Sequence, residues 1–250
     1  MANAHPDLAD VQGHKMFLDP YDSLSLSMNG VYEPLETSIV KQYVKKGDIV
    51  LDIGANIGYY TLLFARLVGD EGKVYAFEPE PDNFELLKKN VEINKYENVV
   101  LIQKAVSDVG GKIRLYLSGD NKGDNRIFDS DDNRPYIDVD MVSLSDYFSD
   151  YKGKVDFVKM DIQGAEGRVV KGMINLLNNN RQIKIISEFW PEGLDRAGTK
   201  PEEYLMTLES FGFKLNIIDE EQSKIISMGV DELIKIYERH EEWNLFCIRD

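Results

Sequence analysis

The sequence predicts an α/β fold in which helices cover both faces of a mostly parallel sheet. From Asp48 onward, short apolar runs alternate with amphipathic helical patterns, which is the arrangement of successive β-α-β units. The run at 49–53 is apolar up to an aspartate and leads directly into glycines, as expected of a buried parallel strand. We therefore expect parallel strands joined by right-handed crossovers.

The remaining elements follow from the same two patterns. Apolar runs predict strands, and apolar residues at helical spacing predict helices. Pro79 and Pro81 open the second helix, because proline is tolerated in the first turn of a helix. Strands are expected at 49–53, 73–78, 98–103, 112–117, 136–142, 155–161, 183–189, 213–219 and 244–249. Helices are expected at 58–68, 82–94, 144–150, 164–180, 201–212 and in part of 219–244.

No internal repeat and no linker divides the chain. We expect one domain at 41–250, an N-terminal extension at 1–40 that caps it, and an inserted hairpin or loop at about 112–142. The insertion contains a polar stretch at 118–135, which is longer than most connections between elements. Such a stretch is typical of either a functional loop or disorder.

The composition limits the classes of partner. The 250 residues include 44 Asp and Glu against 29 Lys and Arg, which gives a net charge of −15. This charge disfavours nucleic acid and anionic membranes, because both are bound through clustered Lys and Arg. An apolar content of 43% is enough for a folded core. The single cysteine, Cys247, cannot form a disulfide within the chain, and no Cys/His cluster predicts a zinc site.

The sequence also favours a cytoplasmic protein. The N-terminal residues contain neither a basic start nor an apolar run, so no signal peptide is indicated. No apolar stretch approaches the roughly 18 residues of a membrane helix. His5, His14 and His240 lie outside the motifs described below, so a histidine-based site is not expected. No pattern indicates the oligomeric state.

The strongest local motif is D-I-G-A-N-I-G at 52–58, between a strand and a helix. Gly54 allows the backbone to approach a ligand, and Gly58 allows close packing where the helix begins. The spacing differs from the G-x-G-x-x-G of dinucleotide sites, because Asn56 stands where a second glycine would admit a pyrophosphate. Asp52 would also repel a pyrophosphate. The motif therefore favours a ligand with a cationic ammonium group and no phosphate.

Two further motifs follow the second and third strands. Glu78 ends the second strand, where a carboxylate can accept two hydrogen bonds from a ribose diol; a helix-capping role is the alternative. The loop expected at 105–108, A-V-S-D, follows the third strand and can cover an adenine ring; an ordinary turn is the alternative. Taken together, the glycine turn and Glu78 favour the ribose interpretation.

The fourth motif is K-M-D-I-Q-G-A-E at 159–166. Asp161 ends one strand and Glu188 ends the next, so both are expected at the sheet edge where α/β folds bind ligands. Glu166 lies in the first turn of the following helix, where a capping role is the alternative. These three carboxyl groups could supply a base, hold a metal ion or form a solvated rim.

These motifs carry a resemblance. DIGANIGYYTLLFA, FEPEPDNFELLKKNVEIN, AVSD and KMDIQGAEGRVVKGM, in this order, resemble the FkbM family of S-adenosylmethionine-dependent methyltransferases, over roughly residues 30–190. The resemblance implies the class I (Rossmann-like) methyltransferase fold: a seven-stranded, mostly parallel sheet with one antiparallel strand. FKLNIID and NLFCIR fit the last two strands. The family usually carries D-x-E-G-x-E, whereas this chain has the uncharged Gln163 at the first Glu.

The resemblance also implies roles for individual residues. S-adenosylmethionine is the expected cofactor, and a small or medium-sized hydroxyl compound is the expected methyl acceptor. A hydroxyl acceptor needs a base or a metal-bound oxygen, for which Asp161 is the first candidate and Glu188 the second. The residues expected to contact the cofactor are Asp52, Gly54, Ala55, Asn56, Gly58, Tyr59, Glu78, Pro79, Ala105, Val106 and Asp161.

Further residues lie close to this expected site. Tyr59 and Tyr60 follow the glycine turn and could face a sulfonium, although Tyr60 shares the apolar face of its helix and is expected to pack on the sheet. A helical pattern beginning around Glu33 is expected to cross the mouth of the pocket. Contact of Glu36 or Thr37 with the amino-acid end of the cofactor is a hypothesis.

Two alternative functions remain at this point. A nicotinamide-dependent oxidoreductase would share the strand, glycine turn, helix and distal acid, but the glycine spacing and the Asp52 charge argue against it. A non-catalytic cofactor-binding module that interacts with a partner protein is also compatible with the sequence. This alternative stays open because Gln163, the position at which the chain departs from the family pattern, lies among the candidate catalytic residues.

Overall fold

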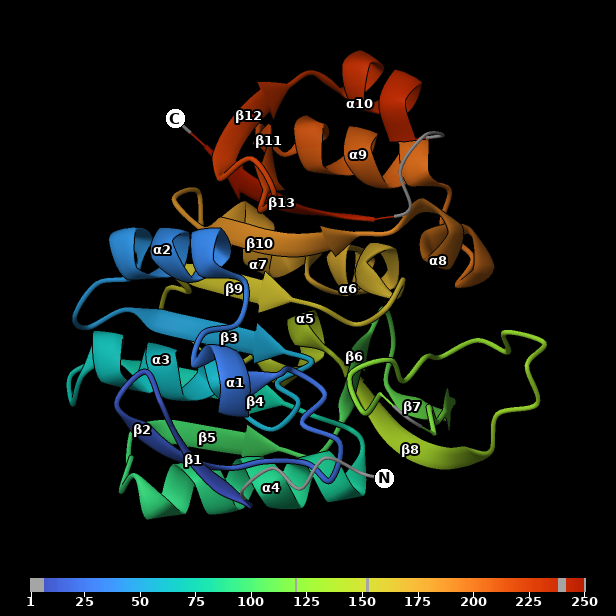
Figure 1. Cartoon of the computed structure of the whole chain (residues 1–250). Coiled ribbons are helices and arrows are strands. Elements are labelled where there is room, and N and C mark those ends of the chain that lie inside the picture. Colours follow the sequence, from blue (N-terminus) through green and yellow to red (C-terminus); the bar gives the residue numbers. More distant parts are fainter. Residues whose placement is uncertain (1–6, 120, 152, 238–241, 250) are drawn as a thin grey trace.

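The computed structural model describes residues 7–119, 121–151, 153–237 and 242–249. At its centre lies an eight-stranded sheet with the strand order β12-β11-β13-β10-β9-β3-β4-β5 (Figure 1). These strands are β3 (Ile49–Ile53), β4 (Lys73–Phe77), β5 (Val99–Ile102), β9 (Phe157–Met160), β10 (Lys184–Phe189), β11 (Lys214–Asp219), β12 (Lys224–Met228) and β13 (Trp243–Ile248).

The sheet is mostly parallel. Parallel pairing joins β10, β9, β3, β4 and β5, whereas β13 runs antiparallel to both of its neighbours, β10 and β11. Strand β12 then pairs antiparallel with β11 at the edge of the sheet. The expected count of seven strands is therefore corrected to eight. The charged residues around the start of β12, at 219–224, are typical of a surface segment, and its short apolar run was therefore not predicted as a strand.

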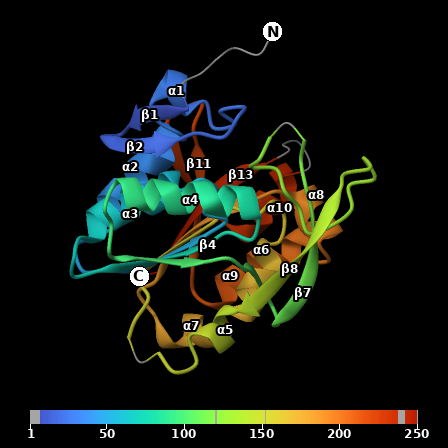
Figure 2. The same cartoon turned by 90° about the horizontal axis from the view of Figure 1, so that it is seen from below.

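Helices cover both faces of the sheet (Figure 2). One face carries α2 (Pro34–Tyr43), α3 (Tyr59–Val68) and α4 (Pro81–Ile93). The other carries α5 (Leu144–Tyr147), α6 (Glu166–Gly172), α7 (Ile174–Asn179) and α9 (Pro201–Ser210), against which α10 (Val230–Tyr237) packs. Neighbouring residues of β3 serve opposite faces: Val50 belongs to the core beneath α3, and Leu51 to the core beneath α6 and α9.

The insertion and the short segment that precedes it form a second, three-stranded sheet. It contains β6 (Ala105–Ser107), β7 (Gly111–Tyr116) and β8 (Tyr136–Ser143), in the order β6-β8-β7. Strands β7 and β8 make an antiparallel hairpin, and β6 pairs parallel to the end of β8. The segment at 105–107 is therefore a buried strand and not the expected loop, because its backbone is paired with residues 141–143.

The N-terminal segment lies against the α3–α4 face. Strands β1 (Leu8–Val11) and β2 (His14–Phe17) form a hairpin, and Asn90 of α4 bonds to both the backbone N–H and the carbonyl of Phe17. Helix α1 (Leu26–Asn29) follows. His14 is buried with Nε2 2.7 Å from the Tyr96 hydroxyl, away from the motifs, while His5 and His240 lie outside the described residues. Within the described ranges, no helix combines the length and apolarity needed to cross a membrane.

Candidate active site

A cavity of about 800 Å³ lies where β3, β4, β9 and β10 end. Its walls come from the glycine turn, the strand ends, β6, the insertion at 121–127, the N-terminal segment around 23–33 and the C-terminal segments 218–222 and 242–244. The sequence-predicted site residues that line it are Asp52, Gly54, Ala55, Asn56, Tyr59, Glu78, Pro79, Ala105, Val106, Asp161 and Glu188. The fold thus brings together motifs that are more than 100 residues apart.

The glycine turn lies directly against the end of β9. Gly54 has φ +80°, and a Cβ atom there would lie 2.1 Å from the Asp161 carbonyl oxygen. The N–H groups of Gly54 and Ala55 both donate to the Phe77 carbonyl at 3.0 Å, which ties the turn to β4. Of the predicted contact residues that the motifs supply, Gly58 does not line the cavity. It packs against α4, where a Cβ atom would lie 2.7 Å from Leu87 Cδ1.

The Glu78 carboxylate is held by the backbone on both sides. Its Oε2 accepts a hydrogen bond from Asn56 N at 2.8 Å, and its Oε1 accepts one from Glu80 N at 2.9 Å. The helix-capping alternative belongs instead to Glu80, whose side chain accepts from Asn83 N. Burial raises the pKa of Glu78 to about 7, even though both backbone bonds favour the ionised form. Each oxygen keeps a lone pair that can accept from a ligand.

Asp52 is almost completely buried at the end of β3. Its Oδ2 accepts a hydrogen bond from the hydroxyl of Thr61 on α3, which fixes the carboxylate beside the glycine turn. Burial raises its pKa to about 6. At neutral pH the cavity therefore contains a carboxylate for which a cationic group would be a favourable neighbour.

A buried lysine organises the opposite wall. Lys159 Nζ lies 3.4 Å from Asp161 Oδ2 and 3.4 Å from Glu36 Oε1. Burial alone would lower the pKa of Lys159, but these two carboxylates raise it well above its usual value. The same ammonium lies 4.5 Å from the centre of the Tyr60 ring. Tyr60 therefore packs against a cation of the protein itself.

The hypothesis that Glu36 or Thr37 touches the cofactor is corrected. Glu36 has no exposed surface and faces Lys159, and the Thr37 hydroxyl bonds to the Tyr32 carbonyl and the Tyr59 hydroxyl. Neither residue lines the cavity. The chain turns into α2 just before them, so that residues 32 and 33 face the cavity instead.

Asp161 and Glu188 differ in access. The Asp161 side chain is 25% exposed, whereas Glu188 is only 7% exposed. Gln163 Nε2 donates to Glu188 Oε1 at 2.9 Å and to Asp161 Oδ1 at 3.3 Å. Burial, and then the Asp161 charge, raise the pKa of Glu188 well above its usual value. Glu166 lies outside the cavity, and its Oε1 accepts from Ile162 N, which supports the turn before α6.

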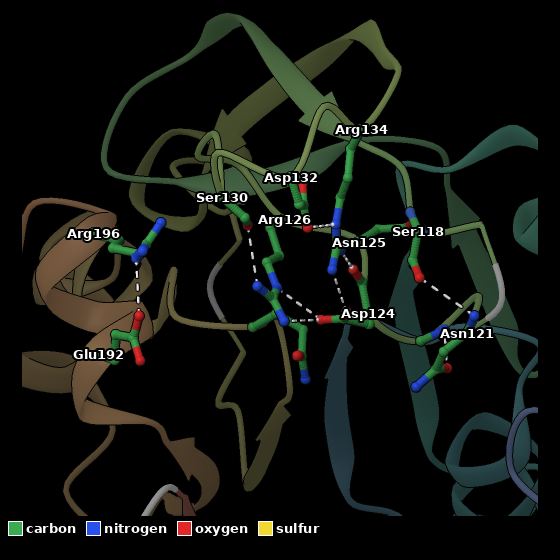
Figure 3. Close-up of polar contacts among 12 residues, drawn as sticks. Ser118, Asn121, Asp124, Asn125, Arg126, Ser130, Asp132, Arg134, Glu192 and Arg196 are labelled. Atoms are coloured by element: carbon green, nitrogen blue, oxygen red, sulfur yellow. Dashed lines mark hydrogen bonds and ion pairs between the residues drawn. The ribbon is translucent and has the colours of Figure 1, made fainter.

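Within the polar stretch, the described residues 121–135 are held together by their own ion pairs (Figure 3). Asp124 lies between two guanidinium groups, 2.7 Å from Arg126 and 2.8 Å from Arg134. The Arg126 guanidinium also lies 4.6 Å from the ring centre of Trp190, two residues after Glu188. Of the two expectations, a functional loop or disorder, the structure favours the loop, whose residues 121–127 line the cavity.

Several lining residues were not found by sequence reasoning. Asn83 stands in the EPEPDN segment and lines the cavity, but no local pattern separates it from an ordinary helix residue. The C-terminal contributors have no motif, because strand pairing alone brings them to the cavity. The missed residues include Ser23, Leu24, Tyr32, Asn83, Lys104, Asp219, Glu220, Glu221, Gln222, Trp243 and Asn244. Among the described residues, no group of three or more His, Cys, Asp and Glu side chains is arranged to hold a metal ion.

Comparison with known proteins identifies the family. The family model "Methyltransferase FkbM domain" matches residues 52–215, about two thirds of the chain. The chain belongs to the FkbM methyltransferase family. The resemblance inferred from the four motifs is therefore confirmed, and family membership supports S-adenosylmethionine as the cofactor. It also favours the methyltransferase over the nicotinamide-dependent alternative.

Individual relatives of this FkbM-family chain are distant. Methyltransferase sdnD of Sordaria araneosa is 25% identical over 66% of this chain and 73% of its own length. Methyltransferase 1 of Beauveria bassiana is 25% identical over 50% of this chain and 57% of its own. A solved structure from Clostridium thermocellum, named as an rRNA-methylase candidate, superposes with a TM-score of 0.52 at 13% identity, over 87% of this chain and 96% of the other. The superposition on the Clostridium thermocellum structure shows that the two chains share the class I methyltransferase fold.

Proposed function

We propose that the chain transfers a methyl group from S-adenosylmethionine to a hydroxyl oxygen of a small or medium-sized acceptor. One observation carries the proposal: the glycine turn with Glu78 and the partly exposed Asp161 carboxylate line the same cavity. A place that holds a methyl donor and a group that accepts a proton are the two requirements of this reaction.

The residues on the donor side fit the cofactor. Glu78 is fixed by two backbone N–H groups and keeps lone pairs for a ribose diol. Ala105 and Val106 present buried apolar surface of β6 to an adenine ring. Asp52 offers a carboxylate to the ammonium end, and the turn lacks the second glycine with which a pyrophosphate site is built.

When bound, the cofactor supplies a methyl group on a positively charged sulfur. The chain's own residues then have two tasks, which are to orient the acceptor and to remove its hydroxyl proton. Asp161 is the proposed base, because its carboxylate is the more exposed of the pair and Lys159 holds it in place. Glu188 is the second candidate and lies deeper, on the far side of Gln163 from Asp161.

A labelled methyl group tests the proposal. The purified chain is incubated with S-adenosylmethionine carrying a tritiated methyl group and with a panel of sugars, hydroxylated peptides and polyketide alcohols. We expect label on a hydroxyl oxygen of one class, and none on matched compounds whose hydroxyls are already methyl ethers. The Asp161→Asn variant should bind the cofactor but transfer the label at least about 100-fold more slowly.

Two results would contradict the proposal. Tight binding of NAD without binding of S-adenosylmethionine would return the oxidoreductase to first place. Good cofactor binding with no transfer to any hydroxyl class would favour the non-catalytic module.

A further inference from the structure

We propose that Gln163 is a positioning residue, which joins the Asp161 and Glu188 carboxylates through one amide group and keeps a further negative charge from lying between them. The inference rests on the proposed function, because these two carboxylates are its candidate bases. Gln163 is the uncharged polar residue between Asp161 and Glu166 in the D-I-Q-G-A-E motif.

The geometry of the amide supports this role. A single nitrogen, Gln163 Nε2, lies 2.9 Å from Glu188 Oε1 and 3.3 Å from Asp161 Oδ1. An amide nitrogen carries two hydrogens, so it can donate to both carboxylates at once. The two acceptors come from the ends of different strands, β9 and β10, and Gln163 donates to both of them. The Gln163 side chain is the hydrogen-bonded link between them.

The backbone at this position is held in an unusual conformation. Gln163 has φ +55°, in the left-handed region that residues other than glycine rarely adopt. The next residue, Gly164, packs against α8 (Pro191–Arg196), where a Cβ atom would lie 2.4 Å from the Gly193 carbonyl carbon. This contact fixes the turn. The Gln163 amide is therefore delivered to the carboxylates by a turn that has little freedom.

The charges around Glu188 explain why a neutral side chain matters. It faces Asp161 and Lys159 from β9, Glu166 from α6 and Glu242 just before β13. Only Lys159 among them is a cation, and it is shared with Glu36. A carboxylate at position 163 would add another negative charge within hydrogen-bond distance of both bases. Like charges this close force one carboxyl to keep its proton.

Two variants distinguish the effect of the hydrogen bonds that the Gln163 amide donates from the effect of its missing charge. Gln163→Asn keeps an amide, and asparagine tolerates the left-handed backbone, but the side chain is one methylene too short to bridge the pair. Gln163→Glu keeps the length and adds the charge. Gln182→Glu, on the exposed turn before β10, makes the same chemical change away from the site and serves as the matched control.

The readout is the titration of the Glu188 carboxyl carbon, followed by NMR on the full chain without ligand. We expect the Glu188 midpoint to rise by about 0.5–1 pH unit in Gln163→Asn, because a hydrogen bond to the ionised form is lost. It should rise by about 1–2 units in Gln163→Glu, where charge is added as well. The control should stay within about 0.2 units of the wild-type chain.

Three outcomes would overturn the inference: no shift in either variant, a fall in either variant, or a rise confined to Gln163→Glu, which would report added charge without a bridge. Methyl transfer gives the second readout, since the single-turnover rate should fall in Gln163→Asn and Gln163→Glu but not in the Gln182→Glu control. If the titrations shift as expected but the wild-type chain transfers no methyl group, the proposed function fails and the Gln163 bridge stands.

Discussion

Gly54 and Asp161 are in contact through their backbones, and a Cβ atom on Gly54 would lie 2.1 Å from the Asp161 carbonyl oxygen. The contact joins the turn after β3 to the end of β9, the neighbouring parallel strand. It also sets how close the donor side of the cavity comes to the carboxylate that we propose as the base. No side chain larger than hydrogen fits between them without moving one strand end.

Gly54→Ala should therefore destabilise the fold by about 2–5 kcal/mol, through overpacking and left-handed strain together. Gly212→Ala is the matched control, since Gly212 has a similar φ of +85° but no atom within 4 Å of the added Cβ. The Gly212→Ala control should lower the free energy of unfolding by only about 1 kcal/mol. Urea unfolding of both variants measures the difference, and equal losses would show that the contact with Asp161 is not tight.

Glu78→Gln should weaken binding of S-adenosylhomocysteine by about 1–3 kcal/mol, because an amide cannot accept both protons of a ribose diol. Burial raises the pKa of Glu78 to about 7, so wild-type affinity should increase as the pH rises from 6 to 8. Calorimetry at three pH values measures both effects. Glu85→Gln, an exposed change on α4, the helix that follows Glu78, should bind as the wild type does. A pH-independent wild-type affinity would remove the assignment of Glu78.

The stability of the ligand-free chain should depend on the same ionisation. The pKa of Glu78 is about 7 in the folded chain and lower when unfolded, so between pH 4.5 and 7 the folded state binds more protons at this site. Its contribution to the free energy of unfolding should then fall as the pH rises, by up to about 1.4 kcal/mol per pH unit. The difference in unfolding free energy between wild type and Glu78→Gln isolates this contribution. A difference that is constant across this range would contradict the raised pKa.

Asp161→Asn should reduce the rate of methyl transfer by about 100- to 10,000-fold, since the hydroxyl proton loses its acceptor. Glu188→Gln should cost less, because Glu188 is the more buried of the two. Single-turnover rates with saturating cofactor provide the comparison. A larger loss of rate in Glu188→Gln than in Asp161→Asn would make Glu188 the base in place of Asp161.

The ion pairs of the insertion should control its motion. Arg126→Met removes the bonds to Asp124 and Ser130 and the contact with Trp190, so amide exchange at 121–127 should accelerate at least about tenfold. Arg196→Met removes only partly exposed pairs with Glu192 and Asp131 and should leave exchange there almost unchanged. Equal protection in both variants would mean that Arg126 does not hold the segment.

The parallel centre of the sheet could be predicted because its strands are apolar and buried. Strand β3 has the expected bounds, and β4, β5, β10, β11 and β13 lie within about one residue of theirs. The glycine turn, Glu78 and Asp161 were placed correctly at one edge, since the carboxyl ends of parallel strands must meet there. Their chemical roles stay predictions until a ligand is bound.

Other features depend on contacts that one-dimensional patterns do not carry. Strand β6 is short, and its pairing with β8 bridges more than 30 residues of sequence. The sequence places Glu36 in the helix that is expected to cross the mouth of the pocket. In the fold, its side chain is instead buried against Lys159. The charged residues around β12 concealed an edge strand that pairs with β11 and packs Ile226 and Met228 against the core.

The cavity extends beyond the part of the chain that carries the family signature. Tyr32 and Glu33 precede residue 52, while the 218–222 turn and Asn244 follow residue 215, and Asn244 Nδ2 donates to Glu33 Oε1 across that gap. Segments from before and after the matched region thus meet in one wall of the cavity. The residues of these flanking walls can change in evolution without altering the matched region at 52–215. Proteins that share this region can therefore differ in the molecules they modify.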